Sequence, residues 1–213
     1  MGSHALLSAS SSKRWIACPP SARLCERYED QGSDYAAEGS EAHALCEYML
    51  KSALGMEASD PRPTFSHYTE EMQECAESYV AFALEIIADI RKTCKDPQIL
   101  IEQKLNFSEY VPGGYGTGDL VICGDGTLYV VDYKHGTGVL VDADGNPQLR
   151  LYGLGSLLLF DGIYDVQTVS MTIFQPRRSN VATEVMSKGD LYRWADEVLK
   201  PAAERAFKGE GEM

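Results

Sequence analysis

The sequence predicts an α/β fold in which a mixed β-sheet of about four core strands is flanked by helices, with an N-terminal helical cap. Two observations predict it. Segments with apolar residues at helical spacing occupy the N-terminal third and the C-terminal end, and segments rich in β-branched residues lie between them. One apolar helical segment interrupts the strand-like ones, which is typical of a strand–helix–strand unit.

Three helices are expected before the sheet. Ser-rich residues 8–13 favour a cap for a helix that begins near Arg14. Glu38–Leu54 is rich in strong helix formers and stops before Gly55, a common residue just past a helix end. Thr69–Lys92 has the spacing of a long amphipathic helix, and acidic residues in its first turn favour that start.

The sheet and the remaining helices follow in order. Pro112-Gly113-Gly114 predicts a turn, and Gly124-Asp125-Gly126 predicts a tight hairpin. The strands are expected over Ile99–Phe107, Asp119–Cys123, Thr127–Lys134 and Val166–Phe174, and the helices over Pro147–Phe160 and Lys188–Ala206.

The length of 213 residues fits one domain. We divide residues 1–213 into an N-terminal helical segment (1–68), a core (69–175) and a C-terminal helix and tail (176–213). Because no apolar run approaches the roughly 20 residues that span a bilayer, and the N-terminus lacks a signal-peptide core, we expect a cytoplasmic protein.

The net charge of −13 argues against a protein that coats nucleic acid through a broad basic surface. It is compatible with an acidic metal centre. The six cysteines form no CxxC pair, which predicts free thiols.

Asp132 and Lys134 should stand side by side, because residues two apart on a strand point to the same face. A carboxylate and an amine that project together from an apolar strand cost desolvation free energy. An ion pair at a sheet edge is one explanation of this pattern, and a chemical site is the other.

Asp119 favours the chemical site. The hairpin makes its strand antiparallel to the next, so Asp119 is expected opposite residue 131 or 132, with about 5 Å between Cβ atoms. Two carboxylates so close repel unless they share a proton or a cation lies between them. A hard divalent ion, Mg²⁺ or Mn²⁺, is the simplest explanation.

Four motifs follow one another along the chain. Glu38–His43 lies on the second predicted helix, and Ser8–Leu24 precedes it. Gly118-Asp119 is followed by Asp132-Tyr133-Lys134 and then by Gln148-Leu149-Arg150-Leu151-Tyr152. Over nearly the whole chain these motifs resemble the RecB-like branch of the PD-(D/E)xK nuclease superfamily, and phage-encoded exonucleases most closely.

The resemblance implies a restriction-endonuclease-like core and a divalent-metal-dependent deoxyribonuclease that hydrolyses phosphodiester bonds. It implies an exonuclease of phage recombination or DNA processing, encoded by a phage or prophage and acting in the host cytoplasm. DNA is the implied partner, and a homo-oligomer or a recombination partner protein is left open. The implied metal ligands for Mg²⁺ or Mn²⁺ are His43, Asp119, Asp132 and the backbone carbonyl of Tyr133; the implied catalytic residues are Asp119, Asp132, Lys134, Gln148 and Tyr152.

Lys134 would orient or activate the water and stabilise charge on the scissile phosphate. Gln148 and Tyr152, four apart on one helix face, would contact the phosphate or the water, although ordinary packing also explains Tyr152. For His43, a surface or satisfied core histidine is the alternative to a metal ligand.

Three secondary residues have weaker support. Glu47 is expected to hold the other ring nitrogen of His43, although solvent exposure is the commoner fate of such a residue. Arg150 is expected to reach a DNA phosphate or to lie on the surface. Glu102 is expected to join a second metal or the water network, or to be an exposed strand residue.

Some members of the branch hold an iron–sulfur cluster through one cysteine near the N-terminus and three near the C-terminus. No cysteine follows Cys123, so we expect no such cluster in this chain.

The competing hypothesis is a catalytically silent DNA-binding or scaffolding module on a nuclease fold. The acidic net charge favours it, and the presence of every residue of the signature argues against it. A hydrolase of free nucleotides is disfavoured because the sequence contains no phosphate-binding GxxxxGK[ST] loop.

Overall fold

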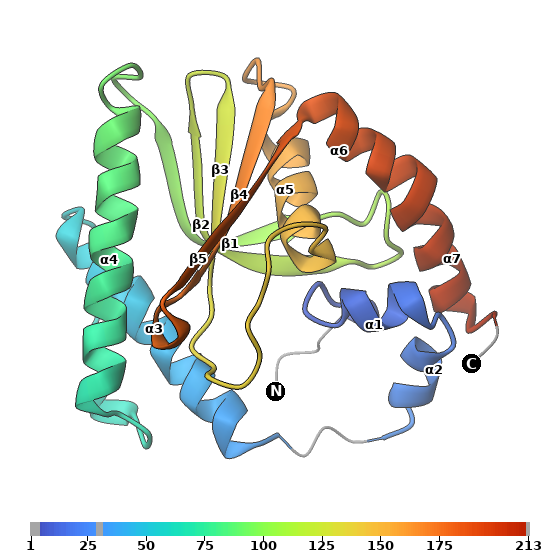
Figure 1. The fold of residues 1–213 in the computed structure, drawn as a ribbon, viewed down its shortest axis with the longest axis horizontal. Helices are drawn as coiled ribbons and strands as arrows, with labels where there is room; N and C mark the ends of the chain where they lie inside the picture. The colour runs from blue at the N-terminus through green and yellow to red at the C-terminus, as the bar shows by residue number, and fades with distance from the viewer. Residues whose placement is uncertain (1–4, 29–31, 212–213) are drawn as a thin grey trace.

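A five-stranded mixed sheet lies between two helical layers in the computed structural model, which describes residues 5–28 and 32–211 (Figure 1). The α/β class with flanking helices and an N-terminal helical region is therefore confirmed. The strands are β1 (Gln98–Asn106), β2 (Tyr115–Gly124), β3 (Thr127–Tyr133), β4 (Thr168–Gln175) and β5 (Asn180–Ser187).

The strands are ordered β1-β2-β3-β4-β5, and every neighbouring pair is antiparallel except β3 and β4. The parallel pair is joined through helix α5 (Pro147–Phe160), as a parallel connection requires. Asp125 and Gly126 both have positive φ, which lets a two-residue turn close the β2–β3 hairpin. The hairpin predicted at this turn is confirmed.

Each face of the sheet is covered by its own set of helices. One face packs against α3 (Asp34–Ala53) and α4 (Glu70–Ile90). The other packs against α5, most of whose apolar residues lie in this core, while Leu159 is exposed. The remaining elements are α1 (Ser12–Ala17), α2 (Ser21–Cys25), η1 (Arg62–Thr64), η2 (Pro176–Arg178), α6 (Lys188–Trp194), the π-helical turn η3 (Ala195–Leu199) and α7 (Lys200–Lys208).

Side-chain caps fix where the long helices begin. Thr69 accepts a hydrogen bond from the backbone N–H of Met72, which confirms the predicted start of α4. Asn146 caps α5 in the same way, directly before Pro147. The helix predicted from Glu38 begins earlier, because Ser33 provides the cap of α3.

The C-terminal part of the chain differs from the prediction. Strand β5 lies within the segment predicted to hold only a helix and a tail, and the helix predicted over Lys188–Ala206 is interrupted by the π turn. β5 is an edge strand with alternate residues exposed, so its sequence lacks an apolar run and its pairing with β4 defines it. Residues 212–213 of the predicted tail lie outside the described residues.

None of the helices that the structure describes combines the length and the apolar character needed to cross a membrane.

Two helical glycines test how tightly α5 is packed on the sheet. A Cβ built on Gly155 would lie 2.9 Å from the Cβ of Leu105, whereas a Cβ on Gly39 in α3 would meet nothing within 4 Å. We expect Gly39→Ala to raise the free energy of unfolding by about 0.5–1 kcal/mol. Gly155→Ala should lower it by about 1 kcal/mol, because a rigid neighbour must move. Chemical denaturation measures both, and a stabilising Gly155→Ala contradicts the packing.

Candidate metal centre

Three acidic side chains lie at one level on three neighbouring strands: Glu102 on β1, Asp119 on β2 and Asp132 on β3. Glu102 lies opposite Asp119, because the residue pairs on either side of it are in register. Asp119 stands one residue before the β2–β3 ladder begins, so continuing that register places it opposite Asp132. Asp119 and Asp132 are 8% and 2% exposed, so the row of acids is largely buried.

The row lies where β2 parts from β3. Figure 1 shows the far half of the β1–β2 hairpin bending away from β3 and passing α5. Here the backbone N–H of Tyr133 donates to Oδ2 of Asp119 at 2.6 Å. The ladder between β2 and β3 ends at Leu120 and Val131, and the Asp119 carboxylate accepts the next N–H of β3 in place of a backbone carbonyl. This hydrogen bond fixes the orientation of the Asp119 side chain.

His43 reaches the same place from α3. Its Nδ1 is 3.2 Å from Oδ1 of Asp119 and 4.0 Å from Oε1 of Glu102. His43, Glu102 and Asp119 each offer a ligand atom, and these atoms all lie within 4.8 Å of one another. The structure thus brings the predicted His43 and Asp119 together, and it gives Glu102 a more central place than its secondary rank in the sequence analysis.

The backbone of Glu102 is strained. Its φ of 51° lies in the left-handed region, which a non-glycine residue rarely adopts inside a strand. Such a conformation costs on the order of 1–3 kcal/mol and persists only where the surroundings enforce it. The strain turns a strand residue toward Asp119, and it is typical of a functional position.

Burial and neighbouring charges together shift the pKa values of the cluster. Burial and the charge of Asp119 raise the pKa of Glu102 to about 7. Burial lowers the pKa of His43, but the nearby carboxylates outweigh this and raise it to about 9. Burial also raises the pKa of Asp132, Lys134 opposes that rise, and Asp119 adds to it. Ionising all three carboxylates in this buried place is therefore costly, and positive charge beside them lowers that cost.

Lys134 connects Asp132 to α5. Its Nζ is 2.8 Å from Oδ2 of Asp132 and donates to Oε1 of Gln148 at 3.0 Å. Gln148 in turn donates to the hydroxyl of Tyr152 at 3.0 Å. All four side chains were predicted site residues, and the structure joins them in one chain of contacts.

One buried oxygen of this chain is left without a hydrogen bond. Oδ2 of Asp132 accepts none from the described residues. The short contact with Lys134 is an ion pair by distance, whereas a hydrogen bond also requires a suitable angle. Oδ2 of Asp132 therefore has lone pairs that no hydrogen bond uses, and a carboxylate oxygen in this state is suited to ligate a cation.

A second polar network holds α3 against β3 behind the cluster. The Tyr133 hydroxyl lies 2.8 Å from Nδ1 of His135, and Nε2 of His135 lies 3.2 Å from Glu38. Glu38 also accepts from Arg177, and the His43 ring packs edge-on against Tyr133. No local sequence pattern predicts this network, because Glu38 and Arg177 are far along the chain from each other and from Tyr133 and His135.

Two secondary predictions are not supported by the geometry. Glu47 accepts from Lys51 at 2.6 Å instead of holding the ring of His43. Arg150 pairs with Glu184 of β5 through both carboxylate oxygens and lies over the ring of Trp194, so it is not free for a DNA phosphate. In both cases a closer partner satisfies the side chain. The metal role of the Tyr133 carbonyl stays a prediction.

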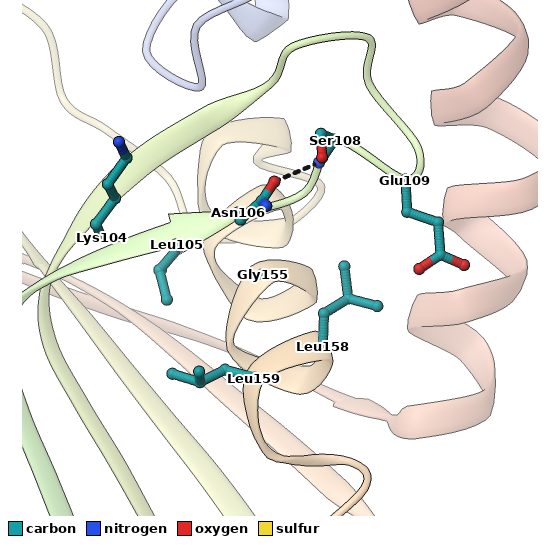
Figure 2. Close-up of a pocket in the computed structure, with 8 residues that line it drawn as sticks. All are labelled: Lys104, Leu105, Asn106, Ser108, Glu109, Gly155, Leu158 and Leu159. Carbon is teal, nitrogen blue, oxygen red and sulfur yellow. Dashed lines mark hydrogen bonds between the residues drawn. The ribbon is translucent and has the colours of Figure 1, made fainter.

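The cavity in Figure 2 is separate from the cluster. It has a volume of about 340 Å³ and lies between the end of β1 and α5. Lys104 and Glu109 lie at its opposite ends, with leucines of α5 between them (Figure 2). It contains none of the predicted site residues.

Comparison with known proteins gives a family and similarity to solved structures. A family model described as "Protein of unknown function (DUF2800)" matches residues 4–213. A solved structure titled "Crystal structure of SSO0001" is similar with 13% sequence identity, covering 94% of this chain and 87% of that chain, at a TM-score of 0.28. A likeness at this TM-score carries no argument about the site, and neither description names an activity.

Proposed function

The chain belongs to the DUF2800 family, and we propose that it is a divalent-metal-dependent nuclease that hydrolyses the phosphodiester bonds of DNA. The observation that carries the proposal is the meeting of His43, Glu102 and Asp119 beside the Asp132–Lys134 pair. The finer part of the proposal is exonuclease action on linear DNA in phage recombination or DNA processing, and it rests on the resemblance of the motifs.

The donor set fits Mg²⁺ or Mn²⁺. Carboxylate oxygens suit both ions, and one imidazole nitrogen is well accepted by Mn²⁺. Burial and the charge of Asp119 raise the pKa values of Glu102 and Asp132, so a divalent cation among these carboxylates would lower the cost of keeping them ionised. His43, Glu102, Asp119 and Asp132 would hold the ion. When bound, it would polarise the phosphate and make a water molecule a better nucleophile at neutral pH.

Lys134 supplies the positive charge on the α5 side of the site. Its amine is held between Asp132 and Gln148, so it needs little reorganisation to meet charge that grows on a phosphate oxygen. Tyr152 is buried and holds Gln148, which orients the amide toward Lys134. Gln148 and Tyr152 therefore act by positioning Lys134, in addition to any contact with phosphate.

The overall charge constrains how DNA is recognised. With a net charge of −13, binding cannot come from a broad basic surface. Contacts to a few phosphates near the cluster, and binding of a strand end, are compatible with this charge.

Metal binding is the first test. We expect Mn²⁺ at one hundred times its dissociation constant to raise the free energy of unfolding by about 2.7 kcal/mol, because the ion binds only the folded protein. Thermal unfolding with Mn²⁺ or with EDTA measures the shift. His67→Ala is a control that should keep the full Mn²⁺-dependent shift. His67 also pairs with a carboxylate, but it is not one of the grouped side chains of the cluster.

DNA cleavage is the second readout of the same experiment. End-labelled linear DNA and closed circular DNA are incubated with the protein and either Mg²⁺ or EDTA. Degraded linear DNA beside intact circles supports an exonuclease. A protein that binds DNA but neither Mn²⁺ nor Mg²⁺ contradicts the proposal and is the outcome expected of a scaffolding module.

A further inference from the structure

A cavity of about 370 Å³, here called the side pocket, adjoins the catalytic residues. Lys134 and Gln148, which are hydrogen-bonded to each other, form part of its wall. Facing them are Ser10, Ser12 and Lys13 at the start of α1. The connection between β3 and α5, drawn in yellow in Figure 1, supplies the rest of the lining, including Val139, Leu140, Asp142 and Asp144.

The connection that forms this wall is hydrogen-bonded to the end of β4, although it contains no helix or strand. Gln175, at the end of β4, is 1% exposed and donates to the backbone carbonyls of Gly136 and Val139. Its side-chain oxygen accepts from the backbone N–H of Val141. One buried amide therefore ties three points of the connection to the sheet.

The tethered backbone presents two apolar side chains to solvent. Val139 is 77% exposed and Leu140 is 56% exposed. Because the backbone around Val139 and Leu140 is hydrogen-bonded to Gln175, their side chains are exposed in a connection that is attached to the sheet. Apolar side chains held in the open at the mouth of a polar cavity are typical of a surface that covers a ligand.

The opposite wall has an unsatisfied polar group. Ser12 is 1% exposed, and its Oγ has no hydrogen-bond partner among the described residues. An unpaired buried hydroxyl costs about 1–3 kcal/mol, so a structure keeps one where it has a use. Lys13, exposed beside it, adds a positive charge to the same wall.

We propose that the side pocket binds one unpaired nucleoside of the DNA substrate, next to the phosphate that reacts at Lys134. This inference rests on the proposed nuclease function. The pocket has the size of a small-ligand site, which holds one nucleoside and excludes a base pair stacked in a duplex. Its apolar rim meets the flat face of a base, and the unpaired hydroxyl of Ser12 and the carboxylates of Asp142 and Asp144 meet the polar edge, where the carboxylates can accept from base amino groups. The substrate must therefore be single-stranded, or frayed at its end, at the reacting nucleotide.

The test uses a short single-stranded oligonucleotide with 2-aminopurine as its terminal base, at the 3′ end in one probe and the 5′ end in another. Titration with the full-length protein in EDTA prevents cleavage. We expect the fluorescence of one probe to rise as its base leaves its stacked neighbour for the pocket. No rise from either end overturns the proposal.

Two variants of the pocket wall locate the binding, and each has a matched control. Leu140→Ser and Lys13→Ala should each weaken probe binding by about tenfold, a loss of about 1.4 kcal/mol. Val185→Ser removes a similarly exposed apolar side chain elsewhere, and Arg14→Ala removes the neighbouring exposed cation; neither should change binding. Equal binding by Leu140→Ser, Lys13→Ala and the controls overturns the proposal.

Ser12→Ala separates a binding role from a structural one. Because its Oγ has no partner, its removal should not lower the melting temperature, yet it should weaken probe binding by several-fold. A variant that loses stability and binds the probe normally contradicts the proposal.

Failure of the pocket and failure of the nuclease are distinguishable. If the wild-type protein cuts DNA with Mn²⁺ while the terminal base of the probe stays stacked, the pocket proposal alone is overturned. A protein that takes up the terminal base but cuts no DNA supports the pocket and overturns the nuclease.

Discussion

Asp119→Asn is expected to lower the rate of DNA hydrolysis by about a hundred- to a thousandfold while the protein still folds. Asparagine keeps an oxygen that can accept the backbone N–H of Tyr133, so the junction of β2 and β3 survives. It removes the charge that faces His43 and Glu102, and with it the negative centre of the proposed metal site. Initial rates on end-labelled linear DNA, with circular dichroism of the same samples, measure the effect.

Asp125→Asn is the matched control, because it makes the same chemical change in the turn that follows β2. Asp125 has a φ of 51° in the hairpin turn, a conformation that asparagine accepts readily. Its cleavage rate should equal that of the wild type. If Asp119→Asn also cuts DNA at the wild-type rate, the catalytic assignment is wrong.

Glu102→Gly is expected to make the metal-free protein more stable than Glu102→Gln by about 1–2 kcal/mol. Both changes remove the buried acid. Only glycine also relieves the left-handed backbone, because it lacks a Cβ. Gln103→Gly is the control at the next residue of β1, and it should be destabilising by about 0.5–1 kcal/mol, as glycine is in an ordinary strand.

The pH dependence distinguishes charge from strain at Glu102. Burial raises its pKa to about 7 in the folded protein, above the usual 4.5, so the folded state binds the proton more tightly. The stability that this proton contributes is complete below pH 4.5 and is lost as the pH rises through about 7. In EDTA, wild-type stability should therefore fall over this range, and Glu102→Gln should reduce the slope.

Denaturant unfolding of these variants in EDTA, at several pH values, provides the measurement. Equal stability of the glycine and glutamine variants contradicts the strain. An unchanged slope in Glu102→Gln contradicts the assignment of the proton.

The local sequence predicted much of the candidate site. The short β2–β3 hairpin fixes its own register through a two-residue turn, so the sequence could place Asp119 opposite residue 131 or 132, and the register of the ladder continues to Asp132. The four-residue spacing of Gln148 and Tyr152 placed them on one face of α5, where they are hydrogen-bonded to each other. These relations depend only on backbone periodicity.

Contacts between distant segments were missed for a common reason. Arg150 was expected to reach a DNA phosphate or to lie on the surface, and its partner Glu184 was not foreseen because it lies on the unpredicted strand β5. Gln175 gave no signal either, because its three tethers run to a connection more than thirty residues earlier in the chain. Partners of this kind are chosen by which elements pack together, and no local pattern encodes that choice.

The sequence by itself determined the α/β class, the hairpin that brings the two aspartates near each other and the Thr69 cap that begins α4, because each follows from the preferences of neighbouring residues. Only the tertiary structure decided that His43 and Glu102 meet Asp119, that Lys134 is held by α5, and that a tethered connection closes a pocket beside it. The physical reason is that burial and charge in the cluster arise from three strands and two helices together, and none of these elements carries the site alone.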